Sequence, residues 1–251
     1  MSSPTLTVTF VRHGQSLDNQ TRGLWAGWKD APLSKHGMNQ ARAAGESLSS
    51  IPFTVIYASP LLRALATAQA IHDAQPAPKP PLTTSPLLRE QHWGVAEGEP
   101  FAAAPDPALG LDEHIARGVY PLLREPWQRF PGGESLEDVG ARAQQAVEEL
   151  VMPHVWDAAR QGRKDVHVAV VSHGIAISEL VRVLVLKDES FGEHPAHRWK
   201  RMLNTAWTRV TVDVKGSKEG EPMNFADDSL PPLEIKVTDF NRSEHFDNLK
   251  H

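Results

Sequence analysis

Short apolar runs separated by longer amphipathic segments recur along this chain. Runs rich in β-branched residues lie at about 7–11, 54–58 and 167–171, each bounded by polar or turn-forming residues, which predicts three buried strands. At 210–214 and 233–237 apolar and polar positions alternate instead, which predicts two further strands that close the sheet. The pattern therefore predicts a β-sheet assembled from segments that lie far apart in the sequence.

Helical spacing of small and apolar residues fills the segments between the strands. Ser34 is expected to cap the first long helix, Ser59 to cap the second, and Ser135 to begin a third through a capping-box-like start. A further helix is expected directly after the strand at 167–171. The predicted helices span about 35–48, 60–74, 136–150 and 175–184.

Alternating strands and helices predict an α/β fold, in the form of a three-layer sandwich with a mainly parallel central sheet and helices on both faces. We expect a single domain over residues 1–251, with a C-terminal hairpin and tail at about 208–251. The proline-rich stretch 75–86 is expected to be irregular. Residues 95–131 show weak periodicity, so we expect an insertion there, partly helical between 111 and 129, that forms a lid over the carboxyl ends of the strands.

The charge balance narrows the classes of partner. With 26 Lys and Arg against 31 Asp and Glu the formal net charge is −5, so no general affinity for nucleic acid or for an anionic membrane is expected. Any site for an anionic substrate must gather its positive charge locally. The chain has no cysteine, which excludes disulfides, thiolate metal ligands and a cysteine nucleophile. Neither a signal peptide nor an apolar run of the ~20 residues that a membrane helix needs is visible, so a cytoplasmic protein is expected.

Two of the predicted strands are each followed by a His-Gly pair. The first pair contains His13 and the second contains His173. In open α/β sheets, ligands bind beyond the carboxyl ends of the strands. Both histidines therefore face one crevice if the two strands are neighbours. A neutral imidazole is a competent nucleophile near pH 7 and needs no strong base to activate it.

Arginine residues near the same strand ends indicate an anionic ligand, in particular phosphate. Arg12 directly precedes His13, and its forked guanidinium suits bidentate contact with phosphate. Arg63 is expected in the first turn of a helix, where free amide groups also favour an anion. Glu90 is the candidate general acid, because a partly desolvated carboxyl beside phosphate would have a raised pKa and keep its proton. Taken singly, Arg63 and Glu90 also fit solvated surface groups, and His173 fits a packed structural histidine.

Histidine and tryptophan residues elsewhere carry weaker signals. His194 and His197 have a spacing that metal ligands can have, but no third ligand is near in the sequence, so a plain loop is expected. Trp25, Trp28 and Trp93 flank the candidate site and are expected either in the core or at the mouth of the insertion.

Six segments of the chain resemble, in order, the motifs of the histidine phosphatase superfamily, in its phosphoglycerate-mutase-like branch. The first segment, RHGQSLDN, is similar to the opening signature RHGxSxxN of that family. The third segment, SPLLRALATA, is similar to the family element SxLxRAxxTA. The six segments cover roughly residues 6 to 210 and lie at 12–19, 27–34, 59–68, 89–98, 131–136 and 171–174.

The resemblance implies a histidine phosphatase fold in which His13 is the nucleophile and Glu90 the proton donor. The implied phosphate-binding residues are Arg12, Asn19, Arg63 and His173, the last of which also counts as catalytic. The resemblance also implies that no metal or other cofactor takes part, because the arginines and histidines neutralise the phosphoryl oxygens. The reaction would run by in-line attack of His13, protonation of the leaving oxygen by Glu90, and hydrolysis of the phosphohistidine by water.

A phosphatase and a mutase share this machinery and differ in the fate of the phosphoryl group. A mutase must retain a doubly anionic intermediate, which calls for extra positive charge in the insertion. The cations there are Arg117, Arg124 and Arg129, with no adjacent basic pair. We therefore expect a metal-independent phosphatase that acts on a small organic phosphomonoester. The alternatives are a phosphoglycerate-mutase-type phosphotransferase and a catalytically silent regulatory protein that binds a phosphorylated ligand, and the sequence leaves the substrate and the choice between monomer and homodimer open.

Overall fold

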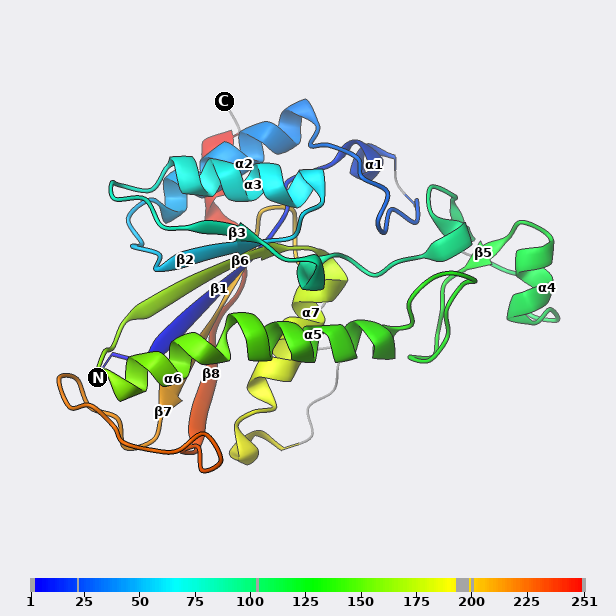
Figure 1. The fold of residues 1–251 in the computed structure, drawn as a ribbon. Helices are drawn as coiled ribbons and strands as arrows, with labels where there is room; N and C mark the ends of the chain where they lie inside the picture. Colours follow the sequence, from blue (N-terminus) through cyan, green and yellow to red (C-terminus); the bar gives the residue numbers. More distant parts are fainter. Residues whose placement is uncertain (1–2, 22, 103, 193–198, 200, 250–251) are drawn as a thin grey trace.

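The computed structural model of this chain describes residues 3–21, 23–102, 104–192, 199 and 201–249. Its centre is a six-stranded β-sheet with helices on both faces (Figure 1). The strands lie in the order β3-β2-β6-β1-β7-β8. They span Leu82–Thr84 (β3), Val55–Ala58 (β2), Val166–Ser172 (β6), Leu6–Arg12 (β1), Trp207–Val214 (β7) and Leu233–Arg242 (β8).

Most of this sheet is parallel. Strands β3, β2, β6 and β1 run parallel to one another, whereas β7 pairs antiparallel with β1, and β8 pairs antiparallel with β7. The register of β1 with β6 aligns Arg12 with Ser172, which are the last residues of the two strands. His13 and His173 therefore leave the sheet at the same edge. The α/β fold with a mainly parallel sheet, as predicted from the sequence, is confirmed.

Two layers of helices cover the sheet. In Figure 1, α2 and α3 lie on one face, and α5, α6 and α7 lie on the other. The α-helices span Leu17–Gln20 (α1), Lys35–Leu48 (α2), Leu62–Asp73 (α3), Leu111–Ala116 (α4), Leu136–Leu150 (α5), Met152–Arg160 (α6) and Gly174–Val185 (α7). The shorter 3-10 helices span Pro86–Leu88 (η1), Gly94–Ala96 (η2), Glu189–Phe191 (η3) and Glu244–Leu249 (η4).

Strand β1 explains why two layers form. Leu6, Val8 and Phe10 are fully buried in the core that the sheet shares with α5, α6 and α7. Val11 belongs to a second core on the other face, together with side chains of α2 and α3. Successive side chains of a strand point to opposite faces of its sheet, so a strand whose side chains are buried at both sets of positions is covered from both sides.

The helix starts follow the predicted capping residues, with one exception. Ser34 accepts a hydrogen bond from an amide in the first turn of α2, and Ser135 forms a capping box with Asp138 at the start of α5. Ser59 does not cap a helix. Helix α3 begins after Leu61, which makes no side-chain capping bond, and the Ser59 hydroxyl is engaged elsewhere.

The proline-rich stretch 75–86 was predicted to be irregular, but part of it forms strand β3. This strand lies at the edge of the sheet and pairs in parallel with β2. The carbonyl of Pro81 accepts the amide hydrogen of Ile56, so the proline just before the strand takes part in the pairing as an acceptor. An edge strand tolerates proline because only one of its sides must be hydrogen-bonded.

The insertion at 95–131 projects beyond the carboxyl-terminal edge of the sheet (Figure 1). It contains α4 and two short strands that pair with each other, Phe101–Ala102 (β4) and Tyr120–Pro121 (β5). Its helical part ends at Ala116 instead of extending toward residue 129, because Gly118 adopts a left-handed conformation with φ of 68°. Ala96 and Phe130 of the insertion form a buried cluster with Trp25 and Trp93, which lie outside it.

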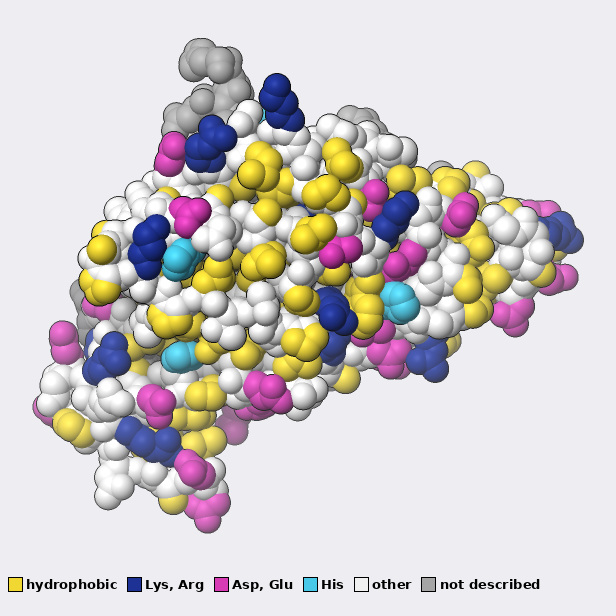
Figure 2. All heavy atoms as spheres, turned by 45° about the horizontal axis from the view of Figure 1, so that its top comes forward, with side chains coloured by type: hydrophobic (Ala, Val, Ile, Leu, Met, Phe, Trp, Pro, Cys, Tyr) yellow, Lys and Arg dark blue, Asp and Glu magenta, His cyan; other side chains and the backbone are white. Residues whose placement is uncertain are grey.

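The surface has mixed charge. On the face shown in Figure 2, basic and acidic side chains of the described residues lie interspersed. Such a mixture is typical of an ordinary solvated surface. Within the described part of the chain, no helix combines the length and the apolar character that a membrane crossing requires.

Candidate active site

Two histidine rings lie side by side where β1 and β6 end. The ring centroids of His13 and His173 are 5.0 Å apart, and both side chains are buried. The parallel pairing of the two strands accounts for this placement, because each ring follows the last strand residue directly. The structure therefore brings together the two His-Gly pairs that the sequence places at strand ends.

The hydrogen bond of the His13 ring defines its tautomer. Nδ1 lies 2.7 Å from the main-chain oxygen of Gly14. A carbonyl oxygen only accepts hydrogen bonds, so Nδ1 carries the hydrogen, and Nε2 of the neutral ring keeps its lone pair.

The surroundings of His13 favour the neutral ring. Burial, followed by the positive charges of Arg63 and Arg12, holds the pKa of His13 well below its ordinary value of 6.5. The hydrogen bond to Gly14 raises the pKa but does not outweigh these effects. At neutral pH the ring is therefore uncharged, with Nε2 available as a nucleophile.

Arg12 and Arg63 reach the site from different elements, the end of β1 and the first turn of α3. Arg63 donates from Nη1 to the main-chain oxygen of Lys29 at 3.0 Å and from Nη2 to that of Gly27 at 2.7 Å. Arg12 donates to the main-chain oxygen of Met202, and its buried Nε has no partner among the described residues. Carbonyl groups orient both guanidinium groups without neutralising them, so their charge remains available to an anion.

His173 is paired with Ser59, the serine that sequence reasoning placed at a helix cap. Nε2 of His173 lies 2.8 Å from Ser59 Oγ, which also accepts the amide hydrogen of Leu61 at 3.3 Å. Among the described residues, Nε2 is the one acceptor within hydrogen-bond distance of this hydroxyl, an arrangement that favours the ring hydrogen on Nδ1. That nitrogen is buried and has no partner among the described residues. Burial and then the charge of Arg63 hold the pKa of His173 well below 6.5, so a neutral ring offers one N–H to a ligand.

Asn19, in α1, is tied to the nucleophile loop through a residue that sequence reasoning missed. Nδ2 of Asn204 donates to the main-chain oxygen of His13 at 3.0 Å and to Oδ1 of Asn19 at 3.2 Å. Asn19 Oδ1 also accepts the amide hydrogen of Ser16 at 3.3 Å. Because its oxygen is occupied, Asn19 can present only its amide nitrogen as a donor to a ligand.

The carboxylate of Glu90 lies against the first turn of α7. Oε1 accepts the amide hydrogen of Ala176 at 3.0 Å, and Oε2 accepts that of Ile175 at 3.2 Å. Amide groups without a partner within the helix favour a negative group at this position. Burial lowers the pKa of Arg12 and of Arg63, and the negative charge of Glu90 opposes that shift in both. Glu90 therefore shares one electrostatic environment with the two arginines.

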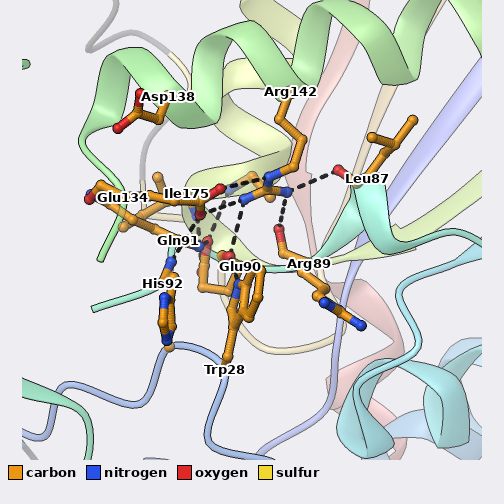
Figure 3. Close-up of polar contacts among 12 residues, drawn as sticks. Trp28, Leu87, Arg89, Glu90, Gln91, His92, Glu134, Asp138, Arg142 and Ile175 are labelled. Atoms are coloured by element: carbon orange, nitrogen blue, oxygen red, sulfur yellow. Dashed lines mark hydrogen bonds and ion pairs between the residues drawn. The ribbon is translucent and has the colours of Figure 1, made fainter. Parts of the chain in front are cut away.

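Arg142, on α5, holds the main chain that carries Glu90 (Figure 3). Its Nη1 donates to the carbonyl oxygens of Leu87 at 2.9 Å and Arg89 at 2.7 Å, and its Nη2 donates to that of Glu90 at 3.1 Å. The guanidinium also pairs with Glu134, with Nε 3.0 Å from Oε1 and Nη2 2.8 Å from Oε2. One side chain thus fixes three carbonyl groups of the loop that precedes and includes Glu90.

Glu134 and Trp28 complete this frame (Figure 3). The Glu134 carboxylate accepts the amide hydrogen of His92 at 2.9 Å, and Trp28 donates from Nε1 to the main-chain oxygen of Glu90 at 2.6 Å. The Trp28 ring stacks on His92 with centroids 4.6 Å apart, and the Arg89 guanidinium lies 4.6 Å from the ring centroid. Trp28 therefore supports the Glu90 loop.

The loop after His13 is fixed by α2 and α3. The amide of Gly14 donates to Thr67 Oγ1 at 3.0 Å, and the amide of Gln15 donates to Gln40 Oε1 at 2.8 Å. A Cβ atom on Gly37 would lie 2.0 Å from the main-chain oxygen of Gln15, so α2 can pack this close only with glycine at that position. Helix packing thereby sets the position of the nucleophile loop.

A cavity of about 830 Å³ opens beside Arg12 and Glu90. Its walls come from the first half of α7, from residues between 122 and 128 of the insertion, and from the segment that precedes β7. Trp93 lines the cavity, whereas Trp25 is packed inside the aromatic cluster beneath the insertion. The volume lies in the range of sites for small organic ligands.

The charged groups of the site are arginines and single carboxylates. Among the described residues, no three His, Asp or Glu side chains come together as a metal-ligand set would. His194 and His197, whose spacing was considered in the sequence, lie outside the described residues.

Comparison with known proteins links this arrangement to one family. Residues 8–219 match the family model of the histidine phosphatase superfamily (branch 1). The chain is 32% identical over 182 residues to the 2,3-bisphosphoglycerate-dependent phosphoglycerate mutase 2 of Gloeobacter violaceus, with 70% of this chain and 74% of that protein covered. It is also 32% identical over 207 residues to the fructose-2,6-bisphosphatase TIGAR B of Danio rerio, with 72% of this chain and 75% of that protein covered.

Solved structures give a similar picture. The mycobacterial glucosyl-3-phosphoglycerate phosphatase matches with a TM-score of 0.65 and 26% sequence identity, over 92% of this chain and 97% of that chain. Another structure of the same phosphatase is a complex with inorganic phosphate. Proteins named as mutases and proteins named as phosphatases are thus both similar to this chain.

Proposed function

Because the chain belongs to the histidine phosphatase superfamily, branch 1, we propose that it is a metal-independent phosphatase. It hydrolyses a small organic phosphomonoester through a phosphohistidine intermediate on His13. The tautomer of His13 carries the proposal. Since the Gly14 carbonyl occupies Nδ1, the lone pair of Nε2 is free, and the charges of Arg12 and Arg63 lie close enough to lower the pKa of the ring.

In the first step, Nε2 of His13 attacks phosphorus in line with the bond to the leaving oxygen. The N–P bond forms as the P–O bond breaks, and Glu90 gives a proton to the leaving oxygen. Negative charge on the other phosphoryl oxygens is stabilised by the side chains of Arg12, Asn19, Arg63 and His173.

In the second step, water attacks the phosphohistidine, and Glu90 takes a proton from that water as inorganic phosphate leaves. The contacts of Glu90 support both roles. Its oxygens accept amide hydrogens from α7, an arrangement that suits the ionised carboxylate and therefore the base. Glu90 also lines the cavity together with Arg12, which places its carboxyl beside the proposed phosphate pocket for the acid role.

The cations of the insertion support hydrolysis over mutase turnover. Arg129 forms an ion pair with Asp138, with 3.0 Å between Nη1 and Oδ2. Arg117 directly follows the last residue of α4 and does not line the cavity. Arg124 is therefore the one arginine among the described insertion residues that lines it. A mutase must bind a doubly anionic intermediate while the phosphoryl groups are exchanged, and one exposed arginine binds such an intermediate only weakly.

A silent phospho-ligand-binding protein is the other alternative. Such a protein has no need of a proton donor or of a fixed histidine tautomer. Here the His13 tautomer, the His173 tautomer and the Glu90 carboxylate are all held by specific hydrogen bonds. These three contacts support an enzyme.

The proposal is tested by assaying p-nitrophenyl phosphate and alkyl phosphates with EDTA present. We expect turnover to persist in EDTA and to fall by about 10³-fold in His13→Asn, because the substitution removes the attacking nitrogen. The matched control is His36→Asn, at an exposed histidine on α2, which should retain wild-type activity. Incubation with labelled substrate followed by an alkaline quench should trap a phosphohistidine.

Three results would contradict the proposal in different ways. Undiminished hydrolysis by His13→Asn would remove the nucleophile. Activity lost in EDTA and restored by a divalent cation would contradict metal independence. Phosphoryl transfer between 3-phosphoglycerate and its bisphosphate that is faster than phosphate release would favour the mutase.

A further inference from the structure

The cavity beside Glu90 contains two buried polar side chains that the proposed chemistry does not use. Ser178 and Glu179, on α7, both line the cavity and are 1% and 2% exposed. Among the described residues, neither Ser178 Oγ nor Glu179 Oε1 has a hydrogen-bond partner. Buried polar atoms in folded proteins nearly always have partners, so two that lack them in one cavity wall indicate a place for a ligand.

The geometry of α7 places these groups at a defined distance from the proton donor. The amides of Ile175 and Ala176 hold the Glu90 carboxylate at the start of the helix. Ser178 and Glu179 come three and four residues after Ile175, which is about 4.5 to 6 Å further along the helix axis. That spacing matches the separation between a phosphoester oxygen and hydroxyl oxygens about four to five bonds away in an extended carbohydrate.

The one hydrogen bond that the Glu179 side chain forms within the described part of the chain, with Arg182, indicates which ligand groups it can still bind. Arg182 donates from Nε to Glu179 Oε2 at 2.7 Å, so one carboxylate oxygen is paired and the other, Oε1, is left without a partner among the described residues. An ionised carboxylate only accepts hydrogen bonds, and the Ser178 hydroxyl both donates and accepts. The partner of this pair must therefore present hydrogen-bond donors, and a group with its own negative charge would be repelled by Glu179 at this depth.

The other walls of the cavity are mainly apolar, with Gln91, Glu125 and Gln128 among the polar side chains that line it. Trp93, Leu122 and Met202 line it, and Leu122 is 53% exposed. Arg124 and Arg201 also line the cavity, but both are exposed, so water screens their charge. A ligand with hydroxyl groups on its edge and C–H groups on its faces would satisfy the polar wall and cover the apolar ones.

We propose that Ser178 and Glu179 form the subsite for the leaving group, and that this group is an uncharged, polyhydroxylated molecule of sugar or polyol type. The inference rests on the proposed phosphatase function, and it adds the substrate class. Hydroxyl hydrogens of the leaving group are donated to Glu179 Oε1 and to Ser178 Oγ, and the phosphate points toward Arg12.

Matched substrate pairs test the subsite. Glucose 6-phosphate and cyclohexylmethyl phosphate are both primary alkyl phosphates with a six-membered ring, and they differ in hydroxyl groups. We expect kcat/KM of the wild type to be higher for glucose 6-phosphate by about tenfold or more, because a site built to pair with hydroxyl groups rejects the analogue that lacks them. Glycerol 3-phosphate should likewise exceed 3-phosphoglycerate, which adds a carboxylate.

Two variants connect the preference to the named residues. Ser178→Ala and Glu179→Met should each bring the ratio for the ring pair toward one. The ratio is taken on one protein preparation, so a loss of folded protein cancels. The control is Glu148→Met, at a helical glutamate that pairs with Lys187 outside this cavity, and it should keep the wild-type ratio.

The outcomes separate this inference from the function on which it rests. A wild-type ratio near one, a preference for 3-phosphoglycerate, or ratios unchanged in both variants would overturn the subsite while the phosphatase stands. Absence of any hydrolysis that depends on His13 would overturn the phosphatase, and the subsite with it.

Discussion

Arg142 donates from Nη2 to the main-chain oxygen of Glu90, at 3.1 Å, although the two residues lie 52 positions apart. The Glu90 carboxylate is meanwhile held by amides of α7. The candidate proton donor is therefore fixed by two helices, its main chain by α5 and its side chain by α7. Its position depends on a residue that makes no contact with the phosphate pocket proposed here.

This dependence predicts that Arg142 acts through Glu90. Arg142→Met should lower kcat for alkyl phosphates by about tenfold more than for p-nitrophenyl phosphate, since a good leaving group needs little proton donation. Arg142→Lys should recover part of the loss, because an ammonium group cannot reach all the carbonyls that the guanidinium reaches. All variants are compared by a leaving-group series and by thermal unfolding. Arg129→Met, at an exposed ion-paired arginine, serves as the control. Equal losses across the series would assign Arg142 to folding alone.

The low pKa of His13 predicts a dependence of stability on pH. The folded protein keeps this ring neutral below pH 6.5, whereas the unfolded chain protonates it. The free energy of unfolding should therefore fall as the pH drops through 6.5, by about 1.4 kcal/mol at pH 5.5 for a ring that stays neutral. Urea unfolding of wild type and His13→Asn at pH 7.5 and 5.5 measures this, and the variant should lose less. A His13 signal that titrates at 6.5 or above in 15N NMR would contradict the expectation.

The contact between Ser59 and His173 predicts a shift in tautomer. In Ser59→Ala the Nε2 atom loses its donor, so the ring hydrogen is no longer restricted to Nδ1. We expect 15N chemical shifts of His173 to move toward the other tautomer, with a fall in kcat/KM of about tenfold from one lost hydrogen bond in the phosphate pocket. Ser85→Ala, at another buried serine, should leave the His173 shifts unchanged. Unchanged shifts in Ser59→Ala would remove the tautomer argument.

The close packing of α2 on the nucleophile loop predicts a penalty at Gly37. Alanine normally stabilises a helix interior relative to glycine by up to about 1 kcal/mol. Gly37→Ala should instead destabilise the protein by about 2 kcal/mol or more and lower kcat, because its Cβ would meet the Gln15 carbonyl at 2.0 Å. Gly110→Ala, where the nearest atom lies 3.8 Å from the added carbon, is the control and should change stability by less than about 1 kcal/mol. A more stable Gly37→Ala protein would show that the loop around Gln15 moves to accommodate the added carbon.

Local pattern predicted the elements that depend on local physics. Six of the seven residues of β1 and six of the seven of β6 are buried, which is typical of parallel strands covered on both faces. Ser34 and Ser135 cap helices because the amides that they accept are within the next three residues. For these elements the interacting groups lie within one turn or one strand, so the sequence contains the whole interaction.

The misses involve partners that are distant in sequence. Ser59 before a proline has the pattern of a cap, but its hydroxyl bonds His173, which is 114 positions away. Arg142 occupies one position of a periodic helix, and its partners in the Glu90 loop are main-chain carbonyl groups, which leave no side-chain signature. Ser178 lies among apolar residues of α7, where a sequence pattern does not show which wall of which cavity it faces.

The insertion at 95–131 is built separately from the two strands that carry His13 and His173. It carries its own pair of strands, β4 and β5, and packs on its own aromatic cluster around Trp25 and Phe130. The register of β1 and β6, which sets the two histidines, draws nothing from that cluster. The insertion supplies one wall of the cavity, with residues between 122 and 128, and α7 supplies another. Substitutions in the insertion can therefore change one wall of the cavity while the strand register that pairs the two histidines stays the same.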